Sequence, residues 1–155
     1  MPEQSVAKPK IEEIAGDYLN GENLENLLSF IAWMRENKIT PTFANKSKIG
    51  VNYTSRVCYL KIRYGSWYFW PAGRNREYLT HFLNNKELNE LVVASLELCN
   101  GCVHTAKCKG QGQTLLICEK EYKNIRCCCP VSICNPTLKN LELIKKAITK
   151  QSKMK

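Results

Sequence analysis

The sequence predicts a single α+β domain, and three patterns lead to that prediction. Apolar residues recur at helical spacing before residue 37 and after residue 136, whereas residues 48–71 alternate between apolar and polar side chains, as half-buried strands do. Eight of the nine cysteines fall between Cys99 and Cys134. We therefore expect a three-stranded antiparallel meander packed with helices, then a cysteine-rich metal-binding segment, then a closing helix.

The composition fits one ordinary domain, with 44% apolar and 24% charged residues in a chain of 155. No apolar run approaches the ~18 residues that cross a bilayer, and the first residues lack the basic-then-apolar pattern of a secretory signal. We expect a soluble, cytoplasmic protein without membrane contact. Within the single domain 1–155 we expect an α+β body at 22–98, a cysteine-rich metal-binding subregion at 99–135 and a closing helix at 136–150.

Helical patterns occur on both sides of the strands. A short amphipathic helix is expected over 10–20, and a stronger one over 24–34, with Asn20 or Asn23 as its cap. Thr40-Pro41 ends helical structure, because the residue before a proline is disfavoured in the helical region.

After the strands we expect helices at 76–82 and 86–98, and a short hairpin at 114–117 and 121–125. Asn135-Pro136 suits a helix start, with asparagine as cap and proline in the first helical position. The inward side chains of that closing helix are expected to be Leu138, Leu141, Ile144 and Ile148.

The register of the meander follows from its second turn. Gly65-Ser66 matches a two-residue hairpin turn with glycine first, which pairs Tyr64 with Trp67. One face then forms the core: Ile49, Val51, Cys58, Leu60, Ile62, Tyr64, Trp67 and Phe69. The opposite face presents Tyr59, Lys61, Arg63, Tyr68 and Trp70.

That second face mixes aromatic rings with cations, and three interpretations stay open. An exposed face of this kind can bind single-stranded nucleic acid by stacking, or hold a flat small molecule. Alternatively, a helix covers it, with the lysine and arginine stems lying along the rings.

The cysteine pattern indicates a metal. Cys99-x2-Cys102 lets two sulfurs of one turn reach the same ion, Cys108 follows after five residues, and Cys127 is the first choice for the fourth ligand. Cys128 and His104 are alternates for one position. Zinc is expected, although four thiolates also bind an iron–sulfur cluster. With four thiolates and no open coordination position, the site would be structural. A second site stays open, because three cysteines are left over: Cys118, Cys129 and Cys134.

Charge and missing catalytic patterns bound the function. The net charge is +9, and residues 101–155 carry 11 basic and 3 acidic side chains, which suits an acidic partner such as nucleic acid. His81 and His104 belong to no recognisable nucleophile–base pair, and no glycine-rich phosphate loop occurs. We assign no catalytic residue and favour a protein that is not an enzyme.

Four segments together carry a resemblance: SKIGVNYTSRVCYLKIRYGSWYF, CNGCVHTAKCKG, ICEKEYKNIRC and NPTLKNLELIKKAI. The chain resembles, over residues 22–150, small uncharacterised bacterial α+β proteins of the Gram-positive, anaerobe type with a C-terminal Cys-x2-Cys-x5-Cys cluster. The resemblance implies a shared set of Cys99, Cys102, Cys108 and Cys127, and no activity. Three residues depart from that pattern: Cys128, Cys129 and Cys118, the last where the pattern has glycine.

From the sequence we therefore expect a non-enzymatic binding or sensing domain with a structural thiolate-bound metal. Its partner would be a small molecule or an acidic macromolecule. One alternative is a redox or iron–sulfur protein in which the cysteine cluster is the working centre. A second alternative is a nucleic-acid-binding protein.

Overall fold

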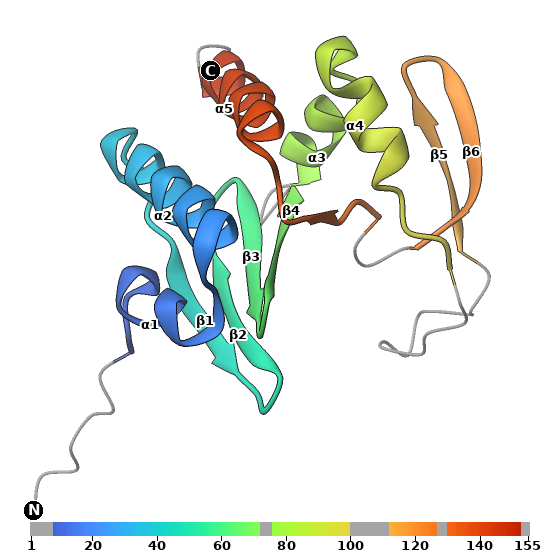
Figure 1. The fold of residues 1–155 in the computed structure, drawn as a ribbon. Helices are drawn as coiled ribbons and strands as arrows, with labels where there is room; N and C mark the ends of the chain where they lie inside the picture. Colours follow the sequence, from blue (N-terminus) through green and yellow to red (C-terminus); the bar gives the residue numbers. More distant parts are fainter. Residues whose placement is uncertain (1–7, 72–75, 100–111, 127–129, 153–155) are drawn as a thin grey trace, which may run out of the picture.

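The computed structural model describes residues 8–71, 76–99, 112–126 and 130–152. They form an α+β fold, as the sequence predicts (Figure 1). In chain order the elements are α1 (Ile11–Tyr18), α2 (Gly21–Glu36), β1 (Thr42–Lys46), β2 (Gly50–Thr54), β3 (Cys58–Arg63), β4 (Ser66–Pro71), α3 (Arg76–Leu83), the 3-10 turn η1 (Lys86–Leu88), α4 (Asn89–Ala94), β5 (Gln113–Ile117), β6 (Lys120–Ile125), β7 (Ile133–Cys134) and α5 (Leu138–Ser152).

The main sheet has five antiparallel strands in the order β1-β2-β3-β4-β7, and β5 and β6 form a separate hairpin. The predicted meander is its centre, β2 to β4, but the expectation of three strands is wrong. β1 is mostly exposed and carries a bulge between Phe43 and Asn45, so it lacks the clean alternation that marks a strand. β7 has only two residues, and its pairing with Tyr68 and Phe69 defines it.

The β3–β4 turn differs from the predicted one by one position. Arg63 lies opposite Ser66 and Ile62 opposite Trp67, so the two loop residues are Tyr64 and Gly65. Gly65 has a φ of +84°, which glycine adopts without the steric cost that a Cβ adds. The observed register differs from the predicted one by two residues. Because side chains alternate with period two, every residue within β3 and β4 keeps its predicted face.

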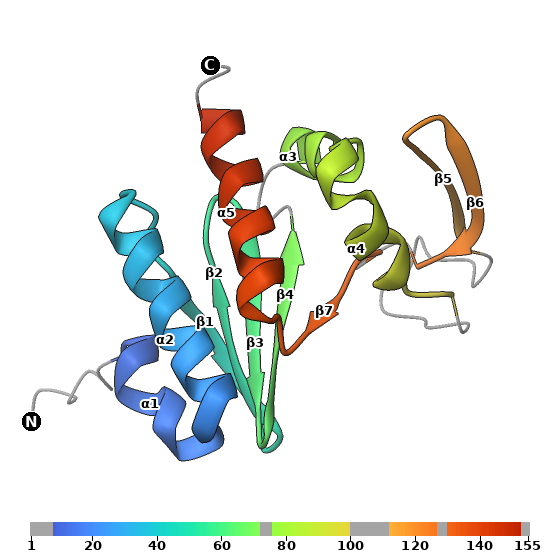
Figure 2. The same ribbon diagram turned by 45° about the horizontal axis from the view of Figure 1, so that its top comes forward.

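The inner face of the sheet is the core. The predicted residues on it that are buried are Val51, Cys58, Leu60, Ile62, Trp67 and Phe69. Helix α2 packs on them: the Phe30 ring centroid lies 6.3 Å from that of Trp67 and 5.9 Å from that of Phe69. Figure 2 shows α1, α2 and α5 together on one side of the strands.

Two residues assigned to the core face are exposed. Ile49 is 56% exposed because it lies in the turn before β2, and Tyr64 is 68% exposed because it lies in the β3–β4 turn. Tyr64 instead contacts Tyr18 of α1, with ring centroids 4.7 Å apart.

The predicted helix at 86–98 is shorter. It consists of η1 and α4 and ends at Ala94, after which Leu96 pairs with Val131 and Leu98 with Ile125. Backbone hydrogen bonds to a distant part of the chain therefore replace the last helical turn. None of the helices in the described ranges is long and apolar enough to cross a bilayer.

The predicted start of the closing helix is also wrong. Asn135 does not cap it: its backbone N–H donates to the Trp67 carbonyl (2.7 Å), and its Oδ1 accepts from the Trp67 N–H (2.9 Å). Helix α5 begins at Leu138, preceded by a reciprocal pair in which Thr137 and Asn140 each donate a backbone N–H to the other's side chain, both at 3.1 Å. Leu138 is 59% exposed, whereas three residues face inward as expected: Leu141, Ile144 and Ile148.

Candidate binding face

Alternate residues of β3 and β4 form the outer face of the sheet, which we define as Tyr59, Lys61, Arg63, Tyr68 and Trp70. Tyr59 lies directly opposite Trp70, and Lys61 directly opposite Tyr68. Cβ atoms of such cross-strand pairs are about 5 Å apart. The pairing therefore gathers the five side chains into one patch, as the alternation predicts.

Each cation of the outer face lies over a ring. Lys61 Nζ is 5.1 Å from the centroid of the Trp70 ring, and Arg63 Cζ is 5.7 Å from that of Tyr68. Both distances lie within the range of cation–π attraction, about 6 Å. The face thus presents aromatic surface and positive charge side by side, with the charged groups placed before any ligand arrives.

The patch continues across the whole sheet. Cross-strand pairing sets up one row from edge to edge: Asn45, Asn52, Lys61, Tyr68 and Cys134. Asn52 Nδ2 donates to Asn45 Oδ1 (2.6 Å), so the amides at the β1 end of the row are tied together. Cys134 at the other end is exposed.

Trp70 is held in place from the β7 side. Its indole N–H donates to Ser132 Oγ at 2.7 Å, which restricts the rotation of the ring. Burial raises the pKa of the Tyr68 phenol, and the neighbouring Cys134 thiol raises it further, against the opposing effect of Arg63. Tyr68 is therefore neutral at physiological pH and keeps its O–H as a donor.

The described helices leave this face accessible. Phe30 of α2 and Phe82 of α3 both pack on Phe69, which points to the inner face. Tyr59 is 38% exposed, and the other four residues of the outer face are half-buried. An aromatic and cationic surface in contact with solvent is therefore available to a ligand.

The predicted metal ligands lie mostly outside the described residues. This applies to Cys102, Cys108 and Cys127, and to the alternates Cys128 and His104. Cys99 is described; it is half-buried and forms no disulfide. Within residues 8–71, 76–99, 112–126 and 130–152, no three side chains of the ligating types lie together as a metal site requires.

Three stretches of chain meet around Cys99. Its backbone N–H donates to the Asn124 carbonyl, and the Arg126 N–H donates to the Glu97 carbonyl, both at 2.8 Å. Gly112 packs against the same place: a Cβ there would lie 2.9 Å from both Cys99 Cβ and Asn124 Cα. Cys99, Gly112 and Asn124 are therefore close in space, and Asn124 lies three residues before Cys127 in the sequence.

Cys118 has a different environment. With Glu119 it forms the β5–β6 turn, and both residues have positive φ, +49° and +70°. The Cys118 N–H donates to Asn84 Oδ1 (3.1 Å), which attaches the hairpin to the end of α3. A left-handed backbone favours glycine, so the glycine that the resemblance implies at this position suits the turn.

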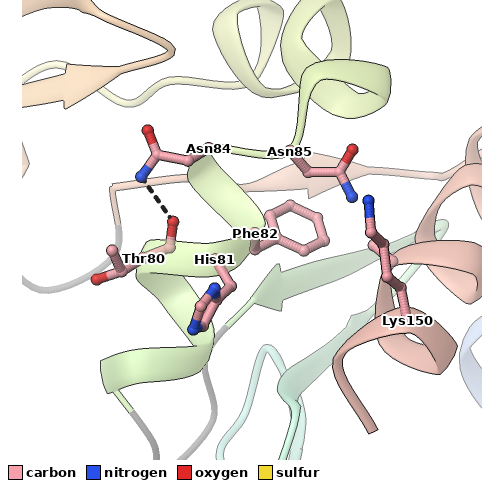
Figure 3. Close-up of a pocket in the computed structure, with 7 residues that line it drawn as sticks. Thr80, His81, Phe82, Asn84, Asn85 and Lys150 are labelled. Atoms are coloured by element: carbon pink, nitrogen blue, oxygen red, sulfur yellow. Dashed lines mark hydrogen bonds between the residues drawn. The ribbon is translucent and has the colours of Figure 1, made fainter. Parts of the chain in front are cut away.

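A cavity of about 260 Å³ lies between α3 and α5, and the sequence did not indicate it (Figure 3). It is lined by Thr80, His81, Phe82, Asn84, Asn85, Ala147 and Lys150. Its amides have structural partners: Asn84 Nδ2 donates to the Thr80 carbonyl (2.8 Å), and Asn85 Oδ1 accepts from the Glu87 N–H. His81 has no carboxylate among these lining residues, so no acid–base pair forms here.

Comparisons of the chain with protein-family models, curated proteins and solved structures give no significant match. The resemblance to small bacterial proteins stays a prediction. Function is therefore inferred from the chemistry of the outer face and of the chain around Cys99.

Proposed function

We propose that the chain is a non-enzymatic binding domain in which the outer face is the binding surface and a thiolate-bound metal supports the C-terminal part. The observation behind this proposal is the accessible patch of three aromatic rings and two cations at the centre of a five-stranded sheet. A planar ligand that carries negative charge fits it best.

The rigidity of the outer face supports a role in binding, because an incidental cluster of surface side chains would not need to be held in place. β3 and β4 are each paired on both sides, so the backbone under the patch is fixed. The hydrogen bond from Trp70 to Ser132 fixes one ring, and the cation–π contacts restrict Lys61 and Arg63. A ligand that stacks on prearranged rings loses less of its affinity to the ordering of side chains.

For the metal we propose zinc, with Cys99 and three further ligands beyond the described residues: Cys102, Cys108 and Cys127, with Cys128 or His104 as replacements. Support comes from the meeting of three chain stretches around Cys99. A structural zinc contributes about 10–16 kcal/mol of folding free energy in small thiolate sites.

The described chain indicates what such a crosslink would stabilise. Residues 95–99 pair with 124–126, which precede Cys127 in the sequence, and with 130–132, which follow Cys129. Because β7 follows directly, a metal at this junction would hold the last strand against β4.

The test of the outer face uses adenosine monophosphate and flavin mononucleotide as planar anionic probes, followed by tryptophan fluorescence. Tyr68→Ala and Trp70→Ala should each weaken binding by about 1–3 kcal/mol, because each removes a stacking surface. Their free energies of unfolding should change by much less than those of core variants.

A matched control is Tyr64→Ala, which removes an exposed ring from the β3–β4 turn and should leave probe binding unchanged. Unchanged binding in Tyr68→Ala and Trp70→Ala would contradict the proposal. The proposal would also be contradicted if both variants unfolded at the same denaturant concentration as a variant of the core.

The test of the metal is elemental analysis of protein purified without oxygen. One zinc per chain without visible absorption supports the structural site, whereas iron with broad visible absorption supports the redox alternative. Cys99→Ser should lose the metal, whereas the control Cys134→Ser should retain it. Folded protein without metal, with all its thiols reactive, would overturn this part of the proposal.

A further inference from the structure

Charge is unevenly distributed along the first hundred residues. Residues 37–76 carry eight lysine and arginine side chains and no aspartate or glutamate. Residues 1–36 carry seven acidic and three basic side chains, and residues 77–100 carry four acidic and one basic. The near-neutral total of the first hundred residues therefore conceals a basic stretch, and residues 42–71, which form the first four strands and their turns, carry five of these cations and no carboxylate.

Four cations of this segment lie on the outer face or in the turns at the ends of β2. Lys61 and Arg63 lie on it, in β3. Lys48 is exposed in the β1–β2 turn and Arg56 in the β2–β3 turn, at opposite ends of β2. The rings thus lie between positive charges, which attracts an extended polyanion more than a ligand with a single charge.

The three rings of the outer face form two rows across β3 and β4, one with Tyr59 and Trp70 and the other with Tyr68. Tyr59 and Trp70 face each other across β3 and β4, and Tyr68 lies two residues before Trp70 on the same strand. Two residues of a strand span about 6.6 Å, so the rows offer separate stacking surfaces for neighbouring planar groups.

We propose that the ligand of the outer face is single-stranded nucleic acid. Two or three successive bases stack on Tyr59, Tyr68 and Trp70, and phosphates pair with Lys61, Arg63 and the cations of the two turns. Bases in a duplex are already stacked on each other, so a flat aromatic sheet selects unpaired strands. This inference rests on the proposed function, because it assigns the ligand class of the same surface.

The experiment measures fluorescence anisotropy of labelled oligonucleotides of about ten residues with the full-length protein, since the platform takes two or three bases. Oligo-dT, oligo-dA, oligo-U and a duplex of the same length are compared. We expect at least tenfold tighter binding of single strands than of the duplex. The DNA and RNA arms show which backbone is preferred.

Salt dependence separates the stacking residues from the phosphate-binding residues. Binding should weaken with a log–log slope of about −0.7 for each phosphate neutralised on a single strand. Lys61→Gln and Arg63→Gln should each make the log–log salt slope shallower by about 0.7, because each removes one phosphate contact. Trp70→Ala should lower the affinity at least tenfold and leave the slope unchanged.

The hairpin offers a matched control. Lys120 Nζ lies 5.5 Å from the Tyr122 ring centroid in β6, which repeats the cation–π pair away from the outer face. Lys120→Gln should leave both the affinity and the salt slope unchanged.

The outcomes separate this inference from the proposed function. If adenosine monophosphate binds but oligonucleotides bind no more tightly, the binding surface stands and the nucleic-acid assignment is overturned. If neither binds, both are overturned. Equal affinity for the duplex, or full affinity in Trp70→Ala and Tyr68→Ala, also overturns the assignment, because charge alone would then account for binding.

Discussion

The two faces of the sheet are made by the same strands and have opposite chemistry. On β4, Trp67 has no exposed surface and stacks near Phe30 of α2. Trp70, three residues later, is half-buried and has Lys61 over its ring. On the inner face aromatic rings meet other rings and aliphatic side chains, whereas on the outer face they meet cations and water.

This contrast shows that neighbours, rather than residue type, separate an aromatic residue of the core from one at the surface. A ring surrounded by apolar side chains contributes its buried area to stability. A ring beside a cation at the surface contributes little to stability and keeps a face for a ligand. The predictions below test that difference, from the largest expected effect to the smallest.

Replacing the two tryptophans should give unequal losses of stability. Trp67→Ala should lower the free energy of unfolding by about 3–5 kcal/mol, because it leaves a cavity in the core. Trp70→Ala should cost about 1–2 kcal/mol, for the hydrogen bond to Ser132 and the contact with Lys61. Urea denaturation followed by circular dichroism measures both. Equal losses would contradict the assignment of the two faces.

Tyr53 makes the inner face sensitive to alkali. Its hydroxyl donates to the Pro9 carbonyl (2.7 Å), and burial raises its pKa to about 12. The unfolded pKa is about 10, so the stabilising effect of the neutral phenol is complete below about pH 10 and is lost as the pH rises towards 12. Burial likewise raises the pKa of Cys58 to about 12, and its contribution has the same sign.

Tyr53→Phe should therefore cost about 0.5–1.5 kcal/mol at neutral pH and make the alkaline loss of stability shallower. Urea midpoints measured from neutral pH to about pH 11 test this, with Tyr59→Phe of the outer face as the control. An alkaline loss of the same steepness in Tyr53→Phe and the unmodified protein would assign that loss to other groups.

The smallest effect on stability is expected for the thiols. Cys58 is fully buried on the inner face and should resist alkylation in the native state, whereas exposed Cys134 at the edge of the outer face should react. Cys134→Ser should change the free energy of unfolding by less than about 0.5 kcal/mol. Peptide mapping after brief alkylation gives both rates. Labelling of Cys58 at the rate of Cys134 would mean that the inner face opens.

Local patterns predicted which residues share a face but not every strand that forms the sheet. Alternation in β3 and β4 assigned the outer face, and the register error was even, so it moved no side chain to the other side. β7 could not be predicted, because two residues carry no period and their partner Tyr68 is distant in the sequence. The local sequence around Asn135 is typical of a helix cap, but its side chain accepts a hydrogen bond from the Trp67 N–H instead.

The candidate site shows the same limit. All five residues of the outer face were predicted, but two neighbours were not: Ser132, which holds Trp70, and Cys134, which lies beside Tyr68. Both come from the C-terminal end of the cysteine-rich subregion, and only tertiary pairing brings them to the outer face. The sequence alone also could not decide whether the outer face is exposed, because that depends on where the helices pack. Of the four proposed metal ligands, Cys99 alone lies in the described chain.

The pairing of Asn135 with Trp67 spans 68 residues. During synthesis the edge of β4 that pairs with β7 therefore stays unpaired until the whole cysteine-rich stretch has left the ribosome. An unpaired strand edge is a template for association with other chains. A nascent or proteolysed chain that stops before residue 130 would expose this edge, so translational pausing or cleavage there should promote aggregation.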